Sequence, residues 1–217
     1  RHQNDIFMRF PVIYAQKEYR LNYILQFLQA INIDIKDIDA FVGRGGLLKP
    51  LKRGGTYKIN TVMLDDLRQE HYGSHACNLG APLAYELASI NNKPAYIVDP
   101  VIIDELDDIA RVSGFKGIDR ISVFHALNHK AIAKRYAKDI NKRYEDLNLI
   151  VAHLGSGISV GWHKHGRIVD VNNALGGQGP FTPERAGTLP FFQLIELCYS
   201  GKYQKEELKK MLVTKGG

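Results

Sequence analysis

The chain has 217 residues, of which 45% are hydrophobic and 24% are charged, and its formal net charge is +6. This composition is typical of a globular protein with a substantial core, and it excludes a low-complexity chain. No apolar run reaches the ~18 residues that a membrane-spanning helix needs, and the N-terminus lacks the apolar core of a signal peptide. The basic residues are scattered, which favours a solvated surface over a nucleic-acid-binding stripe.

The predicted elements alternate between helices and strands. Helical spacing of apolar residues, with Asn60 or Thr61 as one N-cap, predicts helices over 11–31, 60–72, 78–91, 103–112, 124–144 and 189–214. Short apolar runs predict strands at 38–43, 94–99, 147–155, 158–166 and 167–173. Glycines separate the last three runs, which indicates a hairpin or meander. We therefore expect the α/β class, with a sheet that the meander makes mixed rather than all parallel.

The two cysteines, Cys77 and Cys198, stand far apart and form no paired metal motif. Both lie in apolar segments predicted to be helical. We therefore expect buried free thiols in a reducing cytoplasm.

Two pairs of closely spaced histidines lie in predicted elements of the second half of the chain. His125 and His129 are four residues apart, which is a metal-ligand spacing, but no third ligand is visible in the sequence. We therefore assign no metal ligand. His163 and His165 alternate along a predicted hairpin strand and are expected to face solvent.

The segment HLGSGIS at 153–159 places Ser156 between two glycines and two apolar runs. Successive backbone N–H groups in such a turn can bind an anion, although a plain tight hairpin turn fits equally well. The segment is not a P-loop, because no Lys-Ser/Thr pair follows at the required spacing. Downstream, residues 169–190 are dense in glycine, amide and proline and include a lone Arg185. That composition favours a ligand-holding surface loop over a long irregular connection.

The order of these segments resembles the acetokinase family, which comprises the acetate and butyrate kinases. HLGSGISVG is followed by a short hairpin ending in VD and then by GPFTPERAGTLP. VGRGGLLKP, YIVDPV and ISVFHALNHK precede them in the family order, so the resemblance covers nearly the whole chain. VDVNNAL followed by GPFTPER is similar to the butyrate kinase branch.

This resemblance implies a fold of the acetate/sugar kinase, Hsp70 and actin type, with a ribonuclease H-like mixed sheet flanked by helices. Residues 1–150 are then the remainder of an N-terminal domain with substrate-side helices, and 151–217 begin a second, nucleotide-binding domain. The family's first phosphate loop precedes the point where this chain begins, and its adenosine site follows Gly217. We therefore expect a fragment that lacks both family ends and is inactive alone.

The implied reaction moves the ATP γ-phosphate to the carboxylate of a short-chain fatty acid, butyrate or isobutyrate, and gives an acyl phosphate and ADP. ATP and Mg²⁺ are the implied cofactors. The resemblance also implies that the protein self-associates. From the residues themselves we expect a cytoplasmic protein with no nucleic-acid or membrane partner. Two alternatives stay open. One is a branched-chain carboxylate or acetate kinase, and the other is a non-enzymatic actin-like or Hsp70-like nucleotide-binding module.

The resemblance assigns four catalytic residues, Arg44, Asp99, His125 and Arg185. Arg44 and Arg185 would bind the substrate and the transferring phosphoryl group, because a guanidinium binds such anions in bidentate fashion. Asp99 ends a buried strand, where open α/β sheets bind ligands, although it could instead cap the helix predicted at 103–112. His125 begins a predicted helix and would contact the phosphoryl group.

The same resemblance assigns the binding of nucleotide phosphates to the glycine-rich hairpin. The assigned residues are His153, Gly155, Ser156 and Gly157. Ser156 stands where many butyrate kinases have glycine, which is a mild change because serine accepts ordinary turn geometry.

Overall fold

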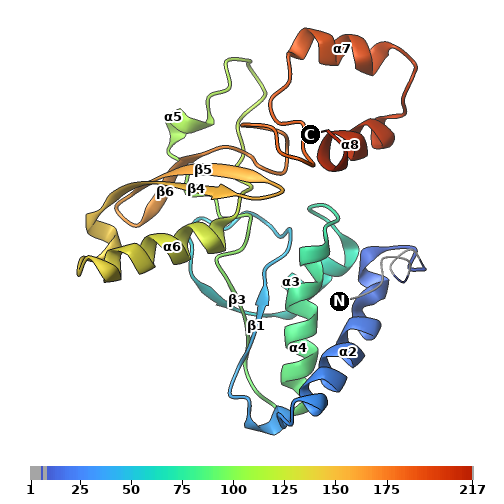
Figure 1. Ribbon diagram of the computed structural model, residues 1–217, viewed down its shortest axis with the longest axis vertical. Helices are drawn as coiled ribbons and strands as arrows, with labels where there is room; N and C mark the ends of the chain where they lie inside the picture. Colours follow the sequence, from blue (N-terminus) through green and yellow to red (C-terminus); the bar gives the residue numbers. More distant parts are fainter. Residues whose placement is uncertain (1–5, 7–8, 217) are drawn as a thin grey trace. The chain divides into compact units, whose positions relative to one another are not determined.

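The computed structural model describes residue 6 and residues 9–216. Residues 1–5, 7, 8 and 217 lie outside the described residues, and so does any sequence prediction that concerns them. The chain divides into two compact units, Arg1–Ile102 (unit 1) and Ile103–Gly217 (unit 2), and each contains its own three-stranded sheet (Figure 1). The domain boundary expected near residue 150 stays a prediction, because compact units do not by themselves test the domains of a longer protein.

The sheet of unit 1 is mixed. It consists of β1 (Phe41–Arg44), β2 (Thr56–Lys58) and β3 (Ala95–Val98), in the order β1-β3-β2. β3 pairs in parallel with β1 and antiparallel with β2. The strands predicted at 38–43 and 94–99 are thus confirmed. β2 was not predicted, because it is only three residues long and follows a glycine-rich loop.

Helices cover this sheet. Those of unit 1 are the 3₁₀ helices η1 (Ile13–Gln16), η2 (Ile35–Asp37) and η3 (Ala76–Leu79) and the α-helices α2 (Lys17–Ala30), α3 (Thr61–Gln69) and α4 (Gly80–Ile90). α4 packs against β1 and β3, and α2 lies beside α4 (Figure 1). The predicted cap of α3 is confirmed, because the Asn60 side chain accepts a 2.9 Å hydrogen bond from the backbone N–H of Met63.

The sheet of unit 2 is an antiparallel meander of β4 (Asn148–Leu154), β5 (Ile158–Lys164) and β6 (Arg167–Val171). The three predicted strands and their meander order are confirmed. The meander forms a sheet of its own, however, and the antiparallel strand of the mixed sheet is β2. The predicted α/β class, with a mixed sheet flanked by helices, is therefore present.

The helices of unit 2 are α5 (Asp108–Arg111), α6 (Ala126–Asp139), η4 (Tyr144–Asp146), α7 (Phe191–Tyr199) and α8 (Lys205–Thr214). The helix predicted at 103–112 shortens to α5, because the Asp104 side chain accepts from the N–H of Leu106 and so forms a turn there. The helix predicted at 124–144 ends earlier, because Asn141 adopts a left-handed φ of 53°.

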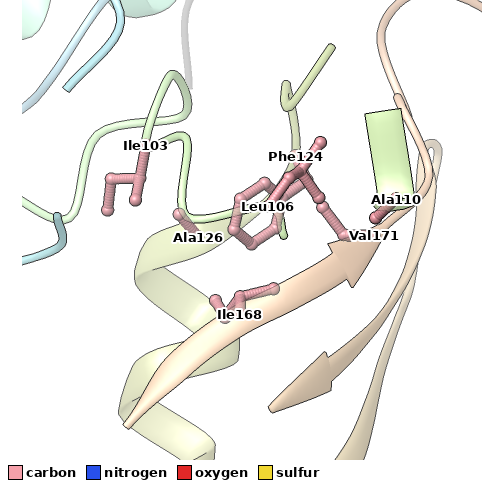
Figure 2. Close-up of a cluster of buried hydrophobic side chains, with 7 residues drawn as sticks. All are labelled: Ile103, Leu106, Ala110, Phe124, Ala126, Ile168 and Val171. Atoms are coloured by element: carbon pink, nitrogen blue, oxygen red, sulfur yellow. The ribbon is translucent and has the colours of Figure 1, made fainter. Parts of the chain in front are cut away.

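The core of unit 2 fixes the start of α6. A cluster of buried apolar side chains comprises Ile103, Leu106, Ala110, Phe124, Ala126, Ile168 and Val171 (Figure 2). Phe124 and Ala126 flank His125 on the chain and are 3% and 0% exposed. Packing on both sides of His125 therefore determines where its backbone lies.

The two cysteines differ. Cys77 is buried as predicted, and burial raises the pKa of its thiol. The prediction for Cys198 is wrong, since its side chain is exposed and none of the described residues of α7 is buried. Among the described residues, no helix combines the length and the apolar character that crossing a membrane requires.

Candidate functional site

The predicted site residues fall into two groups. Arg44 and Asp99 belong to unit 1, and His125, Arg185 and the hairpin residues 153–157 belong to unit 2. Each group is described by itself.

In unit 1, Arg44 and Asp99 lie at the carboxyl ends of neighbouring parallel strands. Arg44 is the last residue of β1 and is in register with Val98, the last residue of β3, and Asp99 follows directly. Asp99 does not cap α5, whose N-cap is Asp107. The capping interpretation is therefore wrong, and the role of Asp99 at a ligand-binding edge stays a prediction.

Asp99 is 4% exposed and adopts a left-handed φ of 39°. Its Oδ1 accepts a 2.7 Å hydrogen bond from the N–H of Gly55, and its own N–H donates to the Gly55 carbonyl at 2.9 Å. A non-glycine residue in this region of φ persists only where its surroundings enforce it, and such residues concentrate at functional sites.

The glycines around Arg44 are required by close packing. A Cβ on Gly43 would overlap the backbone of Gly80 at the start of α4, and one on Gly45 would overlap the Pro100 side chain. The VGRGG segment therefore lets β1 pass within backbone contact of α4. Arg44 is thus held between elements that leave its main chain little freedom.

In unit 2, three of the predicted residues meet at one point. A Cβ on Gly157 would overlap Nη1 of Arg185 and lie 3.2 Å from Cε1 of His125. Neither Gly155 nor Gly157 has a positive φ. Glycine at 157 therefore serves close packing rather than unusual backbone geometry, and the hairpin turn lies directly against the arginine and the histidine.

The loop that carries Arg185 is tied to this turn. The hydroxyl of Thr182 donates to the carbonyl of Ser156 at 2.7 Å and accepts from the N–H of Arg185 at 2.9 Å. Nη1 of Arg185 donates to the carbonyl of Ala174 at 2.7 Å. The buried Nε of Arg185 has no hydrogen-bond partner among the described residues. One edge of the guanidinium is thus anchored, while one donor is not satisfied by the protein.

His153 is also part of this group. Its ring stacks on that of His125, with centroids 3.7 Å apart and planes 7° apart. Nδ2 of Asn128, in the first turn of α6, lies 2.9 Å from Nδ1 of His153. Sequence reasoning missed Asn128, although its place three residues after His125 puts both on one helix face.

A second, buried histidine pair extends from His125 into the core. Nδ1 of His125 lies 2.8 Å from Oγ of Ser159, and that oxygen lies 2.9 Å from Nε2 of His129. Nδ1 of His129 lies 3.2 Å from Nε2 of His163, whose Nδ1 lies 2.7 Å from the hydroxyl of Tyr144. This series of contacts joins α6, β5 and η4.

The prediction that His163 faces solvent is therefore wrong, because its side chain is 0% exposed. Ser159, Gly161 and His163 share the buried face of β5. His165 is exposed, as predicted. Within the described part of the chain, no group of three or more His, Cys, Asp or Glu side chains is arranged to hold a metal ion.

Burial lowers the pKa of both His129 and His163 to about 4. The charge of His163 lowers the pKa of His129 further, and that of Lys130 does the same for His163. Both imidazoles are therefore neutral near pH 7. Because Nδ1 and Nε2 then have one proton between them, each ring has one donor and one acceptor.

The depressed pKa values predict acid destabilisation. Unfolded histidines bind protons near pH 6.5, whereas these two do so only near pH 4. The free energy of unfolding is therefore unaffected by the protonation of these two groups above pH 6.5 and decreases as the pH falls towards 4. The decrease is at most roughly 3 kcal/mol for each histidine. Urea unfolding across this range measures the loss. His163→Gln should flatten the dependence, whereas the exposed control His165→Gln should not, and equal slopes in both variants would contradict the prediction.

Two further buried charges lie beside the site. Nζ of Lys130 on α6 lies 2.9 Å from a carboxylate oxygen of Glu105, and the two side chains are 5% and 3% exposed. Glu105 also accepts from the N–H of Ile168, which pairs with His163 where β6 lies beside β5. Sequence reasoning missed this pair, because nothing local marks a lysine on a helix as buried.

Asp170, the acid of the VD pair that ends the hairpin, is in an ion pair. Its Oδ1 lies 2.9 Å from Nη2 of Arg120, which also donates to the carbonyl of Val171. The other terminal nitrogen of Arg120 donates to the carbonyl of Ala110. Asp170 thus helps to hold the polypeptide around α5 against β6.

Residues 111–215 match the model of the Acetokinase family. Three solved structures resemble the chain as a whole. They are acetate kinase from Porphyromonas gingivalis (TM-score 0.69, 18% identity, 92% of this chain and 53% of that chain), acetate kinase from Entamoeba histolytica (0.66, 19%, 93% and 53%) and a propionate kinase from Francisella tularensis subsp. tularensis SCHU S4 (0.68, 19%, 90% and 53%).

At these identities the likeness to the solved structures shows the fold alone. The chain spans about half the length of each of them. The likeness to these structures confirms the predicted α/β fold of the acetate kinase type, in incomplete form.

Proposed function

We propose that the chain is part of an ATP-dependent short-chain carboxylate kinase, which transfers the γ-phosphate of ATP to a carboxylate and gives an acyl phosphate and ADP. One observation carries the proposal. His125, Arg185 and the turn at Gly157 meet at one point, inside the segment that matches the Acetokinase family. The three residues come from chain segments that are far apart in sequence. Arginine, histidine and the backbone N–H groups of a glycine turn are all groups that bind phosphoryl oxygens.

This group suits phosphoryl transfer to an acid. A carboxylate is already ionised near pH 7, so the nucleophile needs no general base. What remains is positioning and neutralisation of charge on the transferring group. Arg185 provides a fixed positive charge, because its Nη1 is anchored on Ala174, and its unsatisfied Nε is a further donor. His125 provides a second donor from the start of α6.

The roles of Arg44 and Asp99 in unit 1 are also part of the proposal. Arg44 would bind the carboxylate or the phosphoryl group, and its place at a strand end supports this. Magnesium in kinases takes most of its ligands from phosphate and water and only one or two from carboxylates. A single buried carboxylate such as Asp99 therefore fits, and bound Mg²⁺ would neutralise phosphate charge there.

The hairpin turn is the proposed contact for the nucleotide phosphates. Gly155 and Ser156 are exposed, and the turn is fixed by the bond from Thr182 to the Ser156 carbonyl. His153 stands at the base of the same turn. By contrast, the space at Gly157 is filled by Arg185 and His125, so we expect phosphate contact at 155–156.

Butyrate or isobutyrate is the proposed acid. The support for it is the presence of the motifs VDVNNAL and GPFTPER in the loop. The similar solved structures are acetate and propionate kinases, so shorter and branched acids are the competing substrates. One methylene is worth only ~1–3 kcal/mol in a binding pocket. The resemblance further supports a cytoplasmic, self-associating protein.

A hydroxamate assay tests this function. The complete protein is incubated with ATP, Mg²⁺ and each of a series of straight and branched C2–C5 acids, and hydroxylamine traps any acyl phosphate. We expect trapped product with at least one acid and the highest kcat/KM with a C4 acid. Product with none of them would overturn the reaction class, and a preference for acetate would overturn only the proposed substrate.

A further inference from the structure

The buried contacts that lead from Tyr144 to His125 include one group that can only accept a hydrogen bond, the backbone carbonyl of Ser159. Nε2 of His129 lies 3.2 Å from this carbonyl oxygen and 2.9 Å from Oγ of the same serine. Since a carbonyl has no proton to give, the proton between them belongs to His129. Nε2 of His129 is therefore protonated and donates.

This assignment fixes the direction of the contacts further into the core. A neutral His129 with its proton on Nε2 has an acceptor at Nδ1, so Nε2 of His163 is the donor in the 3.2 Å contact between the rings. Nδ1 of His163 is then an acceptor, and the hydroxyl of Tyr144 donates to it at 2.7 Å. The low pKa of both histidines agrees with two neutral rings.

The same assignment fixes the contact on the other side of His129. Oγ of Ser159 accepts from Nε2 of His129, so the proton of the hydroxyl is available for its other partner, Nδ1 of His125, at 2.8 Å. Ser159 is 0% exposed, which keeps water from competing for this proton. An imidazole that accepts at Nδ1 holds its own proton at Nε2.

We propose that Ser159 is a positioning residue that holds His125 as the neutral tautomer with its proton on Nε2. The buried pair His129 and His163 fixes the direction in which the Ser159 hydroxyl donates. His153 is consistent with this state, because two stacked rings 3.7 Å apart repel each other if both are charged. If the proposed function is correct, Nε2–H of His125 is the donor offered to the transferring phosphoryl group. The tautomer itself does not depend on that function.

Nitrogen NMR of the complete protein, labelled with ¹⁵N in its histidine rings, tests the proposal without any activity. In the unaltered protein, His125, His129 and His163 should all be protonated at Nε2 and unprotonated at Nδ1. Protonation at Nδ1 of any of the three would overturn the direction of the contacts. This part of the test needs no variant.

Ser159→Ala tests the link itself. The variant keeps the carbonyl that orients His129 but removes the hydroxyl, so the Nδ1 resonance of His125 should lose its hydrogen-bond shift or change tautomer. Ser122→Ala is the matched control, because Ser122 is also buried in unit 2 and its hydroxyl donates to the carbonyl of Ile103 rather than to a histidine. An Nδ1 resonance of His125 that is unchanged in Ser159→Ala would overturn the role of Ser159.

Discussion

Replacing Arg185 by alanine in the complete protein is expected to lower the turnover number for acyl phosphate formation by ~10³ or more. The guanidinium lies at Gly157 beside His125, is anchored by the Ala174 carbonyl and has a buried donor that no described protein group satisfies. Its charge is therefore fixed before substrate binds, and alanine removes both the charge and the donors. Arg44→Ala is expected to have an effect of the same size.

Two controls separate catalysis from folding in this experiment. Arg143→Ala removes an arginine of the same unit whose side chain is 74% exposed, and it should leave turnover unchanged. Arg185→Lys keeps the charge without the planar fork, so it should recover only part of the activity. Thermal unfolding of each variant shows whether the loss of the bond to Ala174 matters. Near-normal phosphorylation of butyrate by a folded Arg185→Ala or Arg44→Ala variant would contradict the assignment.

Lys130→Met is expected to lower the free energy of unfolding by about 3–5 kcal/mol, because it leaves the carboxylate of Glu105 buried without its counter-charge. The substitution keeps an unbranched apolar stem of similar length in α6, so a packing defect contributes little. Urea unfolding near pH 7 measures the difference.

The matched control is Lys134→Met, one turn further along α6 at an exposed position, which should change stability little. Adding Glu105→Leu to Lys130→Met should recover part of the loss. The recovery is incomplete, because the N–H of Ile168 then loses its acceptor. The expectation fails if Lys130→Met is no more destabilising than Lys134→Met.

The features that sequence predicted well depend on local chemistry. Asn60 caps α3 because its side chain reaches the N–H of Met63, three residues on. β4 and β5 alternate in burial, and short turns that contain glycine separate the three strands of the meander. Such signals act over a few residues, so the sequence specifies them directly.

The features that sequence predicted poorly depend on contacts between distant segments. Alternation shows that Ser159, Gly161 and His163 share a face of β5, but it does not show that α6 covers that face. The same problem applies to Cys198, whose apolar neighbours on α7 lie on a helix without buried positions. For both His163 and Cys198, polarity alone predicted the wrong degree of burial.

Gly157 shows how far the candidate site could be predicted. The sequence predicted a turn at HLGSGIS, with an anion-binding turn and a plain tight hairpin as open alternatives, and in the structure Gly157 of this turn has no room for a side chain. The excluding groups are Arg185 and His125, 28 and 32 residues away along the chain. No pattern in the sequence measures such an approach. The membership of the site was therefore predictable only from the resemblance, and its geometry was not.

The left-handed backbone conformation of Asp99 determines which substitution can test its charge without disturbing the backbone. Asparagine is, with aspartate, among the few residues that adopt this φ without large steric cost, and its side-chain oxygen can replace Oδ1 as acceptor for the N–H of Gly55. Alanine has neither property and would disturb the strand end as well as remove the charge. Asp99→Asn is therefore an isosteric probe of charge, and an alanine scan at this position would confuse electrostatics with backbone strain.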